Sequence, residues 1–234
     1  MRSFDQTWED NIYSKGEQLN RYPFGELVSY VLRLYALEIK SGKKLRALEL
    51  GFGAGNNLAF LAKEGFETYG IEGSKSACDF AKSSFQGLGL TIEVVQGDFV
   101  NLPFPDGFFD LVIDREAVYA NRKEAILKIS TEVKRCLKEG GFFLSFAYST
   151  EHFSATGDLA RKIEPNTFSD FKAGPFHGAG VAHFFTQDEI VNEYFSGFEI
   201  EFLHHHRLDH VIPKKTNQYA EFIVCGRKPC QPRV

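Results

Sequence analysis

The feature that most constrains this chain is a regular alternation of strand and helix patterns between residues 45 and 147. Short apolar runs alternate with amphipathic segments in units of roughly 25 residues, and Gly140-Gly141 is expected to end the last helix. Parallel strands need such long crossover connections, usually helices. The pattern predicts an α/β domain with expected strands at 45–50, 67–71, 91–95, 109–113 and 142–147 and helices at 56–63, 76–85 and 121–137.

The flanking segments complete one domain. Residues 1–24 are polar and aromatic and are expected to form an N-terminal arm or lid, and residues 25–40 have the apolar spacing of a helix. The main domain is expected at 25–234, with an insertion or acceptor lid at 151–185, where the alternation stops. After it come a capping box at 186–189 with a short helical pattern, and two strands expected to form an antiparallel hairpin, 198–205 and 219–226.

A glycine-rich turn, Glu49-Leu-Gly-Phe-Gly-Ala-Gly-Asn-Asn57, follows the first strand of this alternation. Its glycines allow a sharp turn and close approach of a ligand to the backbone, and the helix beginning near Asn56 would point its positive dipole there. The turn suits a dinucleotide, another nucleotide or no ligand. It lacks both the G-x-G-x-x-G spacing of dinucleotide sites, which argues against a dehydrogenase, and the Gly-Lys-Ser/Thr of a phosphate-binding loop. Glu49 would repel a pyrophosphate but could meet an ammonium group.

Two further acidic positions lie at the ends of the next two strands. Glu72, in Gly-Ile-Glu-Gly73-Ser, follows Gly51 by 21 residues, a spacing suited to a carboxylate on ribose hydroxyls. Asp98 and Phe99 follow the third strand. Ligands of open α/β sheets bind outside the carboxyl ends of the strands, so these residues are expected at one site.

In combination these motifs resemble the class I S-adenosylmethionine (SAM) dependent methyltransferase superfamily, from about residue 25 to 148. The resemblance implies a Rossmann-like, doubly wound, seven-stranded sheet, mostly parallel with the last strand antiparallel. It also implies SAM as cofactor, with methionine near Glu49 and the glycines, ribose on Glu72, and adenine against Asp98 and the Phe99 backbone. Gly73 replaces a residue that is often apolar and packs on adenine; Phe99 or an aromatic of the arm is expected to substitute. The expected cofactor-binding residues are Glu49, Gly51, Gly53, Gly55, Asn56, Glu72, Gly73, Asp98, Phe99, Asp114 and Arg21.

The acceptor should lie beside the sulfonium, after the fourth and fifth strands. A hydroxyl or ammonium acceptor needs its proton removed, and the catalytic candidates are His152, His177, His183, Glu116, Tyr119 and Asp114. We expect a small polar acceptor, with oxygen the first accepting atom and nitrogen the second. The arm also resembles those of methyltransferases associated with bacterial surface-polysaccharide synthesis, which suggests a sugar or its activated precursor. The run His204-His205-His206, with Asp209 and His210 nearby, could bind a metal, but consecutive side chains of a strand alternate faces, so at most two histidines point the same way. A solvated strand end is the favoured interpretation, and no metal ligand is assigned.

Composition sets the remaining expectations. The net charge of −4 and the absence of an Asn/Asp-Pro-Pro-aromatic signature argue against a nucleic-acid substrate. Four cysteines without close spacing, no apolar leader and no long apolar run favour a reducing, cytoplasmic location without a membrane partner. The alternatives are an RNA- or protein-modifying methyltransferase and a non-catalytic SAM-binding protein; the oligomeric state is left open.

Overall fold

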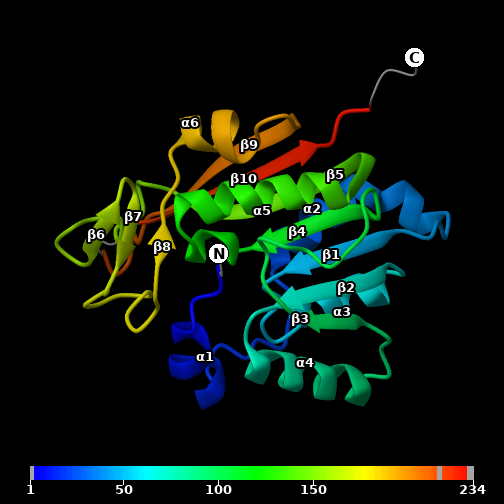
Figure 1. Cartoon of the computed structure of the whole chain (residues 1–234), viewed down its shortest axis with the longest axis horizontal. Helices are drawn as coiled ribbons and strands as arrows, with labels where there is room; N and C mark the ends of the chain where they lie inside the picture. Colours follow the sequence, from blue (N-terminus) through cyan, green and yellow to red (C-terminus); the bar gives the residue numbers. More distant parts are fainter. Residues whose placement is uncertain (1–2, 215–217, 231–234) are drawn as a thin grey trace.

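The computed structural model describes residues 3–214 and 218–230. Seven strands form one sheet in the order β3-β2-β1-β4-β5-β10-β9, and β10 runs antiparallel to both of its neighbours. The expected Rossmann-like sheet with an antiparallel last strand is therefore confirmed (Figure 1). The strands are β1 (Arg46–Leu50), β2 (Glu67–Glu72), β3 (Glu93–Gln96), β4 (Phe109–Arg115), β5 (Leu137–Tyr148), β9 (Glu199–Leu208) and β10 (Tyr219–Arg227).

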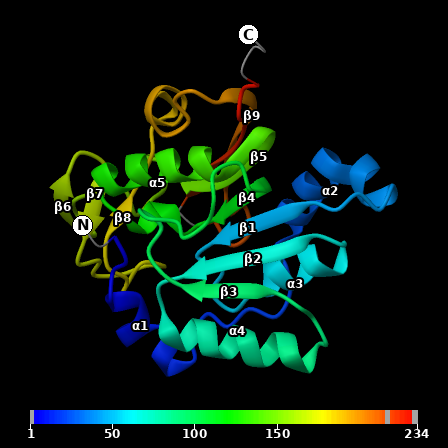
Figure 2. The same ribbon diagram turned by 45° about the vertical axis from the view of Figure 1, so that its right-hand side comes forward.

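Helices cover both faces of this sheet, because the central strands are apolar on both sides. Leu111 and Ile113 of β4 pack in the cluster formed with α2 (Gly25–Lys40) and α3 (Asn56–Lys63). Val112 points the other way, into the cluster formed with α5 (Lys123–Cys136). The fourth helix, α4 (Lys75–Gly87), packs on α3 and runs along the β2–β3 side of the sheet (Figure 2).

The boundary between α5 and β5 differs from the sequence prediction. The helix ends at Cys136, and Gly140 and Gly141 lie inside the long strand β5 instead of terminating the helix. The backbone of this region has partners in the segment that follows β10, since Gly140 N–H donates to Lys228 O and Lys228 N–H donates to Gly141 O. Pairing with the segment after β10 therefore overrides the local glycine signal.

The segment 151–185 folds into a small three-stranded sheet, which the sequence did not predict. Its strands pair antiparallel in the order β6 (Arg161–Glu164), β7 (Thr167–Ser169) and β8 (Ala182–His183). The capping box at Thr186 forms as expected. The helical segment after it is short, consisting of α6 (Gln187–Glu189) and the π-type turn η3 (Ile190–Tyr194).

The N-terminal arm lies across the carboxyl ends of the central strands, next to this insertion (Figure 1). It contains α1 (Thr7–Asn11) and the short turn η1 (Tyr13–Lys15). The Asn11 amide donates to Gly178 O at 3.1 Å, and the Asp5 carboxylate accepts from Val181 N–H at 3.0 Å. Arm and insertion therefore meet over one edge of the sheet.

Within residues 3–214 and 218–230, no helix is both long and apolar enough to span a bilayer. All four cysteines are free, and Cys78, Cys136 and Cys225 are buried.

Candidate functional site

The glycine loop after β1 takes a conformation that requires glycine. Gly51, Gly53 and Gly55 have φ values of 66°, 50° and 79°, in the left-handed region that side chains disfavour. Space is equally restrictive, because a Cβ at Gly51 would overlap Ala117 and one at Gly55 would overlap Phe85. Gly55 then caps α3, whose first turn faces the loop. The turn is thus a tight backbone cradle at the carboxyl end of β1.

Glu49 brings a buried carboxylate to this cradle. One oxygen accepts a hydrogen bond from the Asn57 side-chain amide at 2.7 Å, and the other has no hydrogen-bond partner among the described residues. Burial, together with the nearby charges of Glu72 and Asp114, raises the pKa of Glu49 to about 8 despite the Asn57 bond. A buried carboxylate with a free oxygen is suited to a ligand's ammonium group.

Glu72 ends β2 with a carboxylate that braces the same loop. It accepts hydrogen bonds from Gly53 N–H at 3.1 Å and from Ser74 N–H at 2.9 Å. Burial raises its pKa although these bonds oppose the shift. Glu72 also lines the cavity described next, where the rest of its lone pairs can meet hydroxyl groups.

Two adjoining cavities of about 60 Å³ and about 290 Å³ follow the carboxyl ends of the strands. The smaller one runs from Glu72 to Asp98 and Phe99, and the larger one begins at Glu49 and Asn56. They form one trough, because both are lined by Trp8, Tyr13, Gly51 and Glu116.

The arm closes the smaller cavity. The backbone and hydroxyl of Ser3 and the backbone N–H of Phe4 donate to the Asp98 carboxylate. Burial alone would raise the pKa of Asp98, but these bonds and that from Val100 keep it below its usual value. The Phe4 ring lies against Gly73, where any Cβ would overlap it. An aromatic of the arm therefore stands where the apolar residue missing at position 73 was expected.

The far wall of the larger cavity is formed after β4 and β5. Glu116 has a φ of 56°, a strained value for a residue with a side chain. It pairs with Arg115 and accepts from the Tyr219 hydroxyl. Burial would raise the pKa of Glu116, but Arg115 and these bonds lower it, so the carboxylate is ionised. Tyr119, Tyr148 and Phe176 complete an aromatic wall in T-shaped contact.

Asp114 has a structural position instead of the expected contact with a ligand. Its carboxylate accepts from Ala117 N–H and Val118 N–H and from the hydroxyls of Ser145 and Tyr194. It is 1% exposed and is not part of the lining of either cavity. These four donors fix the turn that carries Glu116, which is why the side chain points under the site.

Among the described residues that line the two cavities, none is one of the three candidate histidines. His152 is buried behind Tyr148 and Phe176, and burial lowers its pKa to about 4 although Glu116 opposes the shift. His183 is held by the Thr167 hydroxyl at 2.7 Å in the small sheet, and His177 is exposed. We therefore no longer propose His177 or His183 as a base, because the folding of the insertion turns them away.

The arm contributes to the site through residues other than those singled out in the sequence. Arg21 is exposed and does not line either described cavity, although Asn20 and Phe24 on either side of it line the larger one. Trp8 and Tyr13 line both cavities instead. Burial, with the charges of Glu72 and Glu49, raises the pKa of Tyr13, so it remains a hydroxyl donor. The aromatic content of the arm was the signal for these residues.

The fold and this trough define a class of protein. A glycine cradle carries a buried carboxylate with a free oxygen at one end, and carboxylates at two successive strand ends follow at the other. This arrangement fits an adenosine cofactor that bears an amino-acid group, with an ammonium at Glu49 and ribose at Glu72. The buried carboxylates of Glu49 and Glu72 on this trough would repel a pyrophosphate.

Comparison with known proteins is consistent with this class. Residues 48–145 match the model of a family described as "Methyltransferase domain". A fatty-acid O-methyltransferase of Mycolicibacterium smegmatis is 35% identical over 138 residues, which are 56% of this chain and 45% of that protein. A sterol 24-C-methyltransferase of Gibberella zeae is 34% identical over 126 residues, 53% of this chain and 30% of that protein. The chain thus matches less than half the length of these two relatives.

The fold also has close counterparts among solved structures. A SAM-dependent methyltransferase of Methanosarcina mazei superposes with a TM-score of 0.69 at 20% identity, covering 90% of this chain and all of the other. At that identity the likeness shows the shared fold. With the family match over residues 48–145 and the cofactor trough, the chain contains a methyltransferase domain with the fold of the class I SAM-dependent enzymes, and SAM is the cofactor that the trough fits.

Proposed function

We propose that this chain transfers the methyl group of SAM to a small polar acceptor, with a hydroxyl oxygen as the first accepting atom and an amine nitrogen as the second. A sugar or its activated precursor is the acceptor class suggested by the resemblance of the arm. The observation that carries the proposal is the continuation of the trough from Glu49 and Gly51 to a wall of polar and aromatic side chains after β4 and β5.

Each half of the trough has a separate task in this proposal. Glu49, Glu72 and Asp98 would hold the ammonium, ribose and adenine of SAM, which supplies an electrophilic methyl group when bound. Phe4, Trp8 and Tyr13 of the arm would cover it and exclude water. Methyl transfer is a displacement that depends mainly on alignment, so fixing both partners in a closed trough supplies much of the catalysis.

Glu116 is the residue of this chain best situated to orient the acceptor. Its carboxylate is ionised and held at a strained backbone position by Arg115 and Tyr219, so it can accept a hydrogen bond from an acceptor O–H or N–H. The side chains of Tyr119 and Tyr148 present aromatic surface beside it. His152 lies one layer behind these rings and is neutral, so its contribution would be to support the wall.

The named relatives include one oxygen and one carbon methyltransferase, so the family match leaves the accepting atom to experiment. The test is incubation of the full chain with methyl-labelled SAM and panels of hydroxyl, amine and carboxylate compounds, followed by mass spectrometry. We expect label in a hydroxyl compound, with sugars and sugar nucleotides in the first panel. Label confined to RNA or protein would replace this proposal with the macromolecular alternative. SAM binding without transfer to any panel would favour a non-catalytic SAM-binding protein.

A further inference from the structure

The three consecutive histidines of β9 have three different environments. His204 contacts the Tyr30 hydroxyl at 2.8 Å and stacks on Phe202, facing α2. His205 points to the opposite face, where its Nε2 is 2.9 Å from the Ser149 hydroxyl. His206 returns to the α2 face and lies 3.0 Å from a Glu26 carboxylate oxygen.

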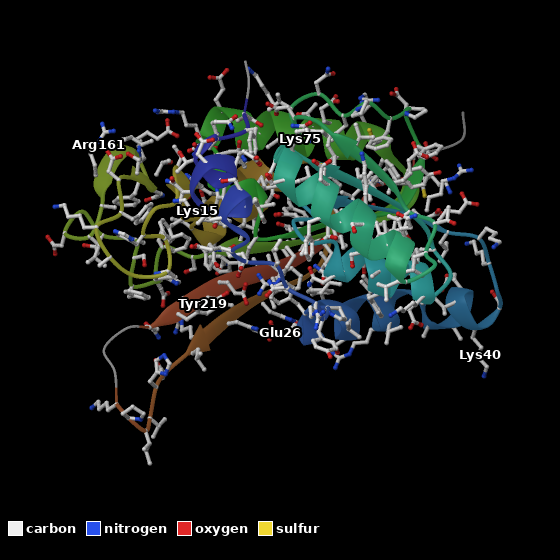
Figure 3. The ribbon with its side chains drawn as sticks, turned by 90° about the horizontal axis from the view of Figure 1, so that it is seen from below. Lys15, Glu26, Lys40, Lys75, Arg161 and Tyr219 are labelled. Carbon is white, nitrogen blue, oxygen red and sulfur yellow. The ribbon has the colours of Figure 1, made fainter. Side chains whose placement is uncertain are left out.

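A third side chain joins His206 and Glu26. Glu221 of β10 is the direct neighbour of His206 across the β9–β10 ladder. One nitrogen or oxygen atom of each of these three side chains lies within 4.8 Å of the other two. The ligand atoms come from α2, β9 and β10, whose approach at the start of α2 can be followed in Figure 3, where Glu26 and Tyr219 are labelled.

The environment of Glu221 is a separate observation that points to a missing ligand at this cluster. The residue is 3% exposed, and its Oε2 accepts no hydrogen bond from any described residue. The guanidinium of Arg115 is 3.8 Å away, beyond hydrogen-bond range, and is already paired with Glu116. A buried carboxylate oxygen that accepts no hydrogen bond is costly, so the folded chain should gain from a cation bound by this side chain.

The charges around the cluster favour a divalent ion. Glu26 and Glu221 carry two negative charges when ionised, and the one positive charge nearby, that of Arg115, is already paired with Glu116. Imidazole with carboxylates is a ligand set that zinc and related first-row metals accept. Access is open, because the side chains of His206 and Glu26 are 38% and 49% exposed.

We propose that Glu26, His206 and Glu221 form a binding site for a divalent transition-metal ion such as Zn²⁺. None of the three lines either cavity of the trough, so the site is separate from the place of methyl transfer. A bound ion would fasten the start of α2 to the β9–β10 hairpin. It would also restrain strand β10, which carries Tyr219. The Tyr219 hydroxyl donates a hydrogen bond to Glu116 in the wall of the larger cavity.

The test is a calorimetric titration of the chelator-treated full chain with Zn²⁺. We expect one site, and a loss of affinity of at least about tenfold in both His206→Ala and Glu26→Gln, since even indirect partners of a metal cost that much. His204→Ala is the matched control, because it is on the same strand and face but outside the cluster, and it should bind Zn²⁺ like the wild type. Zn²⁺ should raise the melting temperature of the wild type and the control more than that of the two variants.

Zn²⁺ affinity is measured without methyl transfer. SAM affinity measured on the same samples tests the proposed methyltransferase function separately from the proposed metal site. Glu26 is exposed and His206 is half-buried, so the melting temperatures of both variants in the absence of metal should stay close to that of the wild type. Failure of the wild type to bind Zn²⁺ would overturn the proposal. Wild-type affinity in His206→Ala would do the same, because the ion would then be held elsewhere.

Discussion

Replacement of Glu49 by Gln should stabilise the free protein while weakening its hold on SAM. In the folded chain burial raises the pKa of Glu49 from 4.5 to about 8. A carboxyl group whose folded pKa is raised contributes stability that is fully present below about pH 4.5 and is lost as the pH rises toward 8. Since a tenfold change in proton affinity corresponds to about 1.4 kcal/mol, the total loss is about 5 kcal/mol, of which about 3 kcal/mol is gone at pH 7.

Glu49→Gln keeps the shape of the side chain and removes the proton equilibrium. The free energy of unfolding of the variant relative to the wild type should therefore rise by roughly 3 kcal/mol between about pH 5 and 8. Its affinity for SAM should fall, because a hydrogen bond to a charged group contributes roughly 1.5–3 kcal/mol. Urea unfolding followed by circular dichroism over this pH series gives the first quantity, and calorimetric titration with SAM gives the second.

Glu93→Gln serves as the control, since Glu93 is an exposed carboxylate in β3 and its replacement should leave both measurements near wild type. A difference in unfolding free energy that does not change with pH would refute the assignment of a raised pKa to Glu49. Unchanged SAM affinity in a folded Glu49→Gln protein would remove this carboxylate from the cofactor site.

Three other outcomes are expected. Glu72→Ala should weaken SAM binding by roughly 1.5–3 kcal/mol per lost hydrogen bond, measured by calorimetry; wild-type affinity would exclude ribose contacts at Glu72. If the Phe4 ring packs on adenine beside Gly73, Phe4→Ala should weaken SAM binding by roughly 1–3 kcal/mol, and Phe4→Leu should weaken it less. Equal SAM affinity of the wild type, Phe4→Ala and Phe4→Leu, measured by calorimetry, would argue against this packing. At saturating SAM, turnover should show no protonation step of His152 near pH 6.5, because burial lowers its pKa to about 4. A fall in rate near that pH that disappears in His152→Ala but persists in His183→Ala would contradict this.

The cofactor half of the site could be predicted from the sequence because its residues are tied to strand ends. Gly51, Glu72 and Asp98 each follow a short apolar run, and local periodicity is enough to locate such runs. Once the strands are known to be parallel, their carboxyl ends must meet at one edge of the sheet, so the three positions converge without knowledge of side-chain contacts. The left-handed φ of Gly51 and the burial of Glu72 agree with that convergence.

The other half required the tertiary structure. Ser3 meets Asp98 across 95 residues, and no local pattern specifies that pairing. The same holds for Phe4 against Gly73. Asp114 and Glu116 are two residues apart and look equivalent in the sequence, yet four hydrogen-bond donors hold the first beneath the site while the strained turn directs the second into it.

The histidines illustrate the same division. That His204 and His206 share a face while His205 takes the other follows from the two-residue period of a strand. The sequence by itself therefore determined which side chains can act together along each element. What stands opposite them was decided only by the packing of distant segments, because the contacts of His206 with Glu26 and of His183 with Thr167 depend on how α2 and the insertion close on the sheet.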